Sequence, residues 1–154
     1  MLKEGDKAPD FSGVDQDGRT VTLGQFSGKK LILYFYPKDN TTGCTAEACS
    51  LRDGYAELKR KGFEIVGVSP DSQKSHRGFA DKHELRFTLI ADTDKSIASA
   101  YGVWGLKKFM GREYMGILRT TFIISGDGVI EKVFTKVDTK DHFRQIAGTY
   151  REEA

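Results

Sequence analysis

The feature that most constrains the fold is a pair of continuous apolar runs separated by an amphipathic stretch. The first run, residues 31–36, ends at Pro37, and the second, residues 63–69, ends at Pro70. Runs of this kind, without alternation, indicate strands buried on both faces. Between them, apolar residues recur at the spacing of one helix face, namely Ala48, Leu51, Tyr55 and Leu58. A strand, a helix and a second strand in this order predict parallel pairing.

Further segments extend this pattern toward both ends of the chain. Residues 11–14 and 19–23 flank a polar turn and predict an N-terminal β-hairpin. After the second apolar run, we expect a helix over 72–85, a strand over 87–91 and a helix over 95–101. The alternation of strands and helices indicates an α/β protein.

The C-terminal part has less regular patterning. Residues 102–115 are rich in glycine and aromatic side chains, and we expect a loop there. Strands are predicted over 120–125 and 129–135, because the Gly-Asp-Gly between them is a strong turn signal. Residues 138–150 predict a closing helix. We therefore expect a thioredoxin-like α/β fold, with a central mixed sheet flanked by helices, over a single domain of residues 1–154.

Composition excludes several functional classes. The chain has 154 residues, 38% of them hydrophobic and 30% charged, as in an ordinary soluble globular protein. No apolar run approaches the roughly 20 residues of a membrane helix, and residues 1–6 are too polar to open a secretory signal. The net charge is only +2 and the basic residues are dispersed. We therefore expect a cytoplasmic protein with no membrane or nucleic acid partner.

The cysteine and histidine content argues against structural disulfides and metals. Two cysteines are too few for a secreted disulfide framework. A structural zinc site usually needs four cysteine or histidine ligands, and the histidines fall in unrelated segments, so we expect no metal and assign them to packing or surface positions. The histidines are His76, His83 and His142.

Continued backwards, the apolar spacing reaches Cys44, and Gly62 after the basic residues 59–61 can take the left-handed conformation that ends a helix. We therefore expect one helix, here called the cysteine helix, that carries both cysteines and ends before Gly62, with Cys44 in its first turn. An ordinary thiol is only a few per cent thiolate at pH 7, and lowering a thiol pKa by about 2.5 units requires ~3.4 kcal/mol. A helix terminus typically supplies ~0.3 to 1 kcal/mol and at most about 2 kcal/mol. A reactive thiol here therefore needs a cation from elsewhere in the chain.

The spacing of Cys44 and Cys49 also restricts how they can react. Residues five apart on a helix are separated by roughly 8 to 9 Å, whereas bridged cysteines need Cα atoms within about 7 Å. The two thiols cannot form a disulfide while the helix is intact. A bond between them requires at least one turn to unwind, which suits a redox cycle better than a structural link.

The segment from Pro37 to Cys49 resembles the corresponding segment of the peroxiredoxins. Their signature is a proline, three residues, a threonine or serine, two residues and the reactive cysteine, which here are Pro37, Thr41 and Cys44. The second cysteine five positions later is similar to the subgroup called bacterioferritin comigratory protein or peroxiredoxin Q. Thr42 stands where that subgroup usually has proline. The opening at residues 5–11 also resembles the family.

The resemblance implies a role for each of these residues. Cys44 would be the peroxidatic cysteine, which becomes a sulfenic acid, and Cys49 would resolve it as an intramolecular disulfide. Arg119, an ordinary strand-end charge by sequence alone, would hold the thiolate and polarise the peroxide. Thr41 would hydrogen-bond the sulfur and the reacting oxygen, and Pro37 would shield the sulfur from water.

The resemblance also implies substrates and partners. The substrates would be hydrogen peroxide and small alkyl hydroperoxides, bound by Thr41, Arg119 and the backbone N–H of Gly43. Thioredoxin or a related dithiol protein would reduce the disulfide, and no metal or organic cofactor is expected. We expect a monomer or a weak homodimer.

Two alternatives remain open. One is a general thiol–disulfide oxidoreductase, although the chain lacks a C-x-x-C motif; turnover of a disulfide such as insulin would distinguish it. The other is a redox sensor or binding protein, which would be oxidised without turning over when a reductant is supplied.

Overall fold

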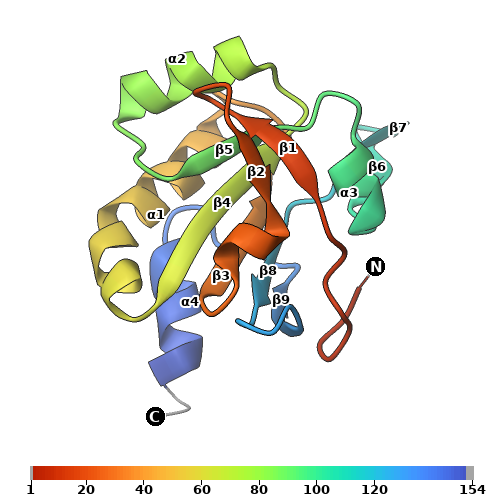
Figure 1. The fold of residues 1–154 in the computed structure, drawn as a ribbon. Coiled ribbons are helices and arrows are strands. Elements are labelled where there is room, and N and C mark those ends of the chain that lie inside the picture. Colours follow the sequence, from red (N-terminus) through yellow and green to blue (C-terminus); the bar gives the residue numbers. More distant parts are fainter. Residues whose placement is uncertain (1, 152–154) are drawn as a thin grey trace.

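A computed structural model describes residues 2–151 and arranges them around a mixed β-sheet (Figure 1). In this part of the chain the sheet has seven strands in the order β2-β1-β5-β4-β3-β8-β9. Their bounds are β1 (Ser12–Asp15), β2 (Thr20–Thr22), β3 (Lys30–Phe35), β4 (Phe63–Ser69), β5 (Thr88–Ala91), β8 (Thr120–Ile124) and β9 (Ile130–Phe134). The helices are η1 (Leu23–Phe26), α1 (Thr42–Arg60), α2 (Gln73–His83), α3 (Ser96–Ala100) and α4 (His142–Arg151).

The sheet pairing agrees with the predicted α/β pattern. β3 pairs with β4, and β4 with β5, in parallel. The N-terminal hairpin of β1 and β2 joins β5 antiparallel, and β8 joins the other side of β3 antiparallel. The predicted mixed sheet and N-terminal hairpin are therefore confirmed.

Apolar side chains form a core on each face of the sheet. On one face, buried residues of β3, β4 and β5 pack with α1, α2 and α4. On the other face, side chains of the same strands and of β8 pack with α3 and with the segment before β1. Because β3 is covered on both faces, its sequence after Lys30 is apolar and buried, as a central strand requires.

The cysteine helix α1 has the predicted bounds. Thr41 is its N-cap, and Gly62 has a φ of +86° just beyond its C-terminus. That left-handed conformation costs glycine little, so the helix stops there. Cys44 is in the first turn and only 1% exposed, on the face that packs against the sheet.

The predicted loop over residues 102–115 is wrong. This segment forms a separate hairpin of β6 (Trp104–Phe109) and β7 (Arg112–Ile117), which lies beside α3 (Figure 1). Its two turn residues, Met110 and Gly111, both have positive φ, as in a type I′ turn. Methionine is not the usual residue there, and most of the hairpin is exposed, so no alternation of apolar and polar residues marks the strands.

Element ends shift by small amounts elsewhere. The closing helix begins at His142 rather than at 138, because the Asp138 carboxylate accepts the Lys140 N–H and forms a turn. Helix α2 begins after Ser72, whose hydroxyl oxygen accepts the N–H of Ser75. None of the helices in residues 2–151 is long and apolar enough to cross a membrane.

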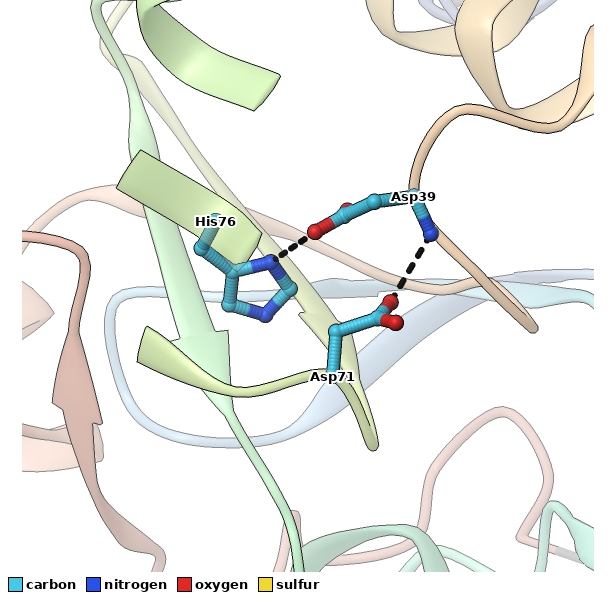
Figure 2. A group of neighbouring side chains, drawn as sticks. All are labelled: Asp39, Asp71 and His76. Carbon is cyan, nitrogen blue, oxygen red and sulfur yellow. Dashed lines mark hydrogen bonds and ion pairs between the residues drawn. The ribbon is translucent and has the colours of Figure 1, made fainter. Parts of the chain in front are cut away.

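A buried polar cluster fixes the loop between β3 and α1 (Figure 2). The carboxylate of Asp39 lies 2.7 Å from Nδ1 of His76, and both side chains are buried. Asp39 also accepts hydrogen bonds from the hydroxyl groups of Tyr36 at 2.7 Å and Ser75 at 2.8 Å. Its backbone N–H donates to Asp71 at 2.8 Å. The loop before the cysteine helix is thereby attached to the first turn of α2.

The hydrogen bonds of the cluster account for its arrangement. Nε2 of His76 lies 3.0 Å from the carbonyl oxygen of Ile90, so both ring nitrogens face oxygen atoms of the protein. Asp71 accepts a further bond from the hydroxyl of Ser69 at 2.6 Å. Ligand atoms of Asp39, Asp71 and His76 lie within 4.8 Å of one another. Hydroxyl and N–H groups of the protein already donate to the carboxylates of Asp39 and Asp71. The cluster therefore has the hydrogen-bond pattern of a structural cluster.

We predict that Asp39→Asn destabilises the protein by about 1 to 3 kcal/mol, because an amide cannot accept all of the hydrogen bonds that the buried carboxylate makes with Tyr36, Ser75 and His76. Urea denaturation measures the free energy of unfolding. Asp81→Asn is the matched control, because Asp81 pairs with Arg77 on the exposed face of α2, where a salt bridge contributes less than about 1 kcal/mol. Equal losses in the two variants would contradict a structural role for the Asp39–His76 pair.

Candidate active site

The candidate site is built around the thiol of Cys44. The first-turn N–H groups of α1 have no partner four residues earlier in the helix, so the backbone at Gly43 and Cys44 presents free donors and a partial positive charge. The thiol is free, and its residue is 1% exposed. A thiolate at this position gains from the helix terminus and is shielded from bulk water.

Arg119 supplies the expected cation. It lies immediately before β8, which pairs with β3, so the sheet carries it to the start of the cysteine helix. Its Nη2 donates to Sγ of Cys44 at 3.2 Å. Burial lowers the pKa of Arg119, but the neighbouring Glu47 carboxylate and Cys44 sulfur raise it above its usual value. The guanidinium therefore stays charged beside the thiol.

Glu47 holds the guanidinium in place. Its Oε1 accepts a hydrogen bond from Nη1 of Arg119 at 2.6 Å, while its side chain is fully buried. Burial raises the pKa of Glu47 to about 7, and the positive charge of Arg119 opposes that rise. Cys44 and Glu47 are three positions apart, so both lie on the same face of α1. One arginine thus contacts two side chains of one helix.

His142 lies behind this carboxylate as a neutral side chain. Its Nε2 is 2.8 Å from the hydroxyl oxygen of Thr121 and 3.8 Å from Oε2 of Glu47. Nδ1 is 2.8 Å from Oε1 of Gln145. Burial lowers the pKa of His142 to about 4, although the hydrogen bond to Gln145 opposes the fall. A neutral ring leaves Arg119 as the cation that faces Glu47 within hydrogen-bonding distance.

The remaining predicted site residues lie in the loop before α1 and in its first turn. A Cβ atom added at Gly43 would lie 3.4 Å from Nη2 of Arg119, an ordinary contact distance, so the backbone of Gly43 lies directly beside the guanidinium. Pro37 is partly buried in the loop. Thr41 differs from expectation: its hydroxyl donates to the carbonyl oxygen of Lys38 at 2.9 Å rather than to the sulfur. That bond closes the loop before α1, and the threonine side chain is exposed.

Cys49 lies on a different part of the helix surface. It is a free, half-buried thiol whose sulfur faces Nδ1 of His83 at 4.0 Å, at the end of α2. The structure therefore brings together a cysteine and a histidine for which the sequence offered no partnership. Both cysteines lie within the continuous helix α1, as predicted from their spacing.

Two more side chains complete the surroundings of Cys44. Tyr34, in the central strand, is buried, and among the described residues its hydroxyl has no hydrogen-bond partner. Burial and the nearby Glu47 carboxylate raise its pKa well above the usual range. Lys107, on β6, is half-buried, and burial together with the charge of Arg119 lowers its pKa. The hairpin of β6 and β7 thus brings a second basic side chain toward the site.

This arrangement suits nucleophilic chemistry at sulfur. A guanidinium and a helix terminus stabilise negative charge on the thiol, and the same donors can stabilise charge that develops on an attacked oxygen. Arg119 was assigned by resemblance, whereas Glu47 could have been found from its helical spacing to Cys44. The involvement of His142 and Lys107 depends on strand pairing and helix packing, for which no local pattern gives a signal.

Comparison with known proteins agrees with this chemistry. Residues 4–133 match the model of the AhpC/TSA family. The chain is 46% identical over 153 residues to peroxiredoxin Bcp of Escherichia coli K12, covering 99% of this chain and 98% of the relative. It is also 46% identical over 151 residues to peroxiredoxin Bcp of Bacillus subtilis 168, covering 98% and 96%.

Solved structures share the fold. A Xanthomonas campestris bacterioferritin comigratory protein, described for its alkyl peroxide reduction activity, superposes with a TM-score of 0.86 at 32% identity, covering 93% of this chain and 91% of that one. A cysteine-to-serine mutant of Xylella fastidiosa PrxQ superposes with a TM-score of 0.93 at 27% identity, covering 99% and 98%. The predicted thioredoxin-like fold is therefore confirmed. The chain belongs to the AhpC/TSA family and, within it, is a peroxiredoxin of the bacterioferritin comigratory protein group, a thiol peroxidase.

Proposed function

We propose that Cys44 is the peroxidatic cysteine of this thiol peroxidase and that Cys49 resolves it. The observation that carries the proposal is the hydrogen bond of 3.2 Å from Arg119 Nη2 to the Cys44 sulfur at the N-terminus of α1. A cation and a helix terminus act together on this thiol. Both are needed, because a helix terminus alone supplies at most about 2 kcal/mol of the ~3.4 kcal/mol that lowering a thiol pKa by about 2.5 units requires.

The first step is attack of the Cys44 thiolate on one oxygen of a hydroperoxide. The O–O bond breaks, sulfur gains the oxygen as a sulfenic acid, and the other oxygen leaves and takes up a proton as water or an alcohol. In this proposal Arg119 and the backbone N–H of Gly43 bind the two oxygen atoms and stabilise the leaving charge. Thr41 is proposed as a further substrate contact, because it is the N-cap residue beside them. Pro37 shields the sulfur.

The second step joins the two cysteines. The Cys49 sulfur attacks the sulfenic sulfur of Cys44, the S–O bond breaks, and water is released as the disulfide forms. Because both residues lie on α1, the helix must unwind between them first. Glu47 lies within that segment, so unwinding also releases its bond to Arg119.

Recycling requires an external dithiol protein, for which we propose thioredoxin. Hydrogen peroxide and small alkyl hydroperoxides are the proposed substrates, and no metal or organic cofactor takes part. We further propose a cytoplasmic enzyme, because a cycle of free thiols and a transient disulfide needs a reducing compartment. Residues 1–154 would act as a single domain, in a monomer or a weak homodimer.

Substitution of each cysteine separates the two steps. We expect Cys44→Ser to abolish peroxide consumption, because the attacking sulfur is lost. Cys49→Ser should complete one turnover and stop at the sulfenic acid, which intact-mass spectrometry after rapid mixing detects as one added oxygen. Loss of the first turnover in the Cys49→Ser protein would show that the two roles are reversed.

Substitution of the arginine tests the electrostatic part of the proposal. Arg119→Leu should lower the rate of Cys44 alkylation by iodoacetamide at pH 7 at least about tenfold, equivalent to ~1.4 kcal/mol of lost thiolate stabilisation. The experiment uses the Cys49→Ser background, so that only one thiol reacts. Arg112→Leu is the matched control, because Arg112 is an exposed residue of β7. An unchanged rate in Arg119→Leu would remove this arginine from the site.

Hydrogen exchange tests the unwinding of the helix. On oxidation we expect faster amide exchange over residues 45–50 and little change over 55–59, because Leu51 is fully buried and anchors the remainder of α1. Reduced protein measured under the same conditions is the control. A Cys44–Cys49 disulfide with unchanged protection over 45–50 would contradict the need for unwinding.

A further inference from the structure

Cys49 lacks the two aids that activate Cys44. It lies about two turns into α1, whereas the effect of a helix terminus falls off within the first turn. The guanidinium of Arg119 is hydrogen-bonded to the sulfur of Cys44 and to Glu47. An ordinary thiol is mostly protonated at pH 7, yet the thiolate is the form that attacks a sulfenic acid. The resolving step therefore needs a group that takes the proton of Cys49.

His83 is placed to be that group. Its Nδ1 lies 4.0 Å from Sγ of Cys49, within the range of a hydrogen bond to sulfur. Two contacts hold the residue at the end of α2: Arg52 Nη1 donates to its carbonyl oxygen at 2.9 Å, and its ring packs edge-on against Phe79 at 5.1 Å between centroids. The side chain is only half-buried. Its position is thus defined, while solvent can still exchange its proton.

A basic side chain, that of Arg52, lies near this pair. The hydrogen bond to Asp53 is the largest cause of the raised pKa of Arg52, and the nearby Cys49 sulfur raises that pKa further. Lys82 precedes His83 and Glu84 follows it on the α2 side. A neutral imidazole beside a basic side chain can accept a proton from sulfur and leave the resulting anion with a nearby cation.

We propose that His83 is the general base of the resolving step, an inference that rests on the proposed roles of Cys44 and Cys49. The Cys49 S–H proton passes to Nδ1 of His83. The thiolate then attacks the sulfenic sulfur of Cys44, the S–O bond breaks, and the departing hydroxide takes up a proton to form water. No external oxidant is needed, because the peroxide has already oxidised Cys44.

The test measures each step in a single turnover of the full chain. Reduced protein is mixed with one equivalent of hydrogen peroxide, quenched with acid at set times and analysed by mass spectrometry for sulfenic acid and disulfide. We expect His83→Gln to form the disulfide at least about tenfold more slowly at pH 7, since general bases typically contribute more than that. The sulfenic acid should form at the wild-type rate, which also shows that the variant is folded.

A second variant and a matched control separate base catalysis from packing. His83→Ala should be equally slow, and added imidazole should restore its rate of disulfide formation in proportion to concentration. Lys82→Gln removes a charge from the same turn of α2 at an exposed position and should react like wild type.

The outcomes distinguish this inference from the proposed function. If wild type forms no Cys44–Cys49 disulfide, the resolving role of Cys49 is wrong and the base has no step to serve. If wild type forms it and His83→Gln matches its rate, only the role of His83 is overturned. Slow variants that imidazole does not rescue would likewise reject base catalysis and leave His83 as a packing residue.

Discussion

The geometry of the site depends on one guanidinium that is shared between a thiol and a buried carboxylate. Arg119 donates to the Cys44 sulfur and to Glu47, two residues on the same face of α1. Without the arginine, Glu47 would be an uncompensated carboxyl group in the protein interior, and burial already raises its pKa to about 7. Arg119 can contact both Cys44 and Glu47 only while α1 is helical between them. The reactive geometry therefore exists only when the first two turns of α1 are folded.

Helix α2 adds contacts on both sides of those turns. Its first turn holds the loop before Cys44 through the buried pair of Asp39 and His76, and its last turn brings His83 to Cys49. The two contacts differ in burial. The Asp39–His76 pair is almost fully shielded from solvent, whereas the Cys49–His83 contact lies near the surface. This difference agrees with a loop that stays fixed and with the proposed resolving role of Cys49, which requires that residue to move.

Much of this arrangement is encoded locally. Apolar spacing and backbone preference predict the strand before Pro37, the helix that carries both cysteines and its stop at Gly62. All three are confirmed. Glu47 also follows a local rule, because it lies three positions after Cys44. The hairpin at residues 104–117 was missed for a physical reason: it lies outside the main sheet and is largely exposed, so burial imposes no alternation on its sequence.

By itself, the sequence determined the order of the strands of the main sheet and of the helices α1 to α4, the placement of Cys44 in a helical first turn, and the need for unwinding before Cys49 can reach it. These depend on spacings of a few residues, which the backbone geometry of a helix makes definite. Only the tertiary structure decided which distant groups meet the cysteines. Arg119 arrives by the antiparallel pairing of β8 with β3, and His83 by the packing of α2 on the sheet, because strand pairing and helix packing join residues whose separation in sequence carries no local signal.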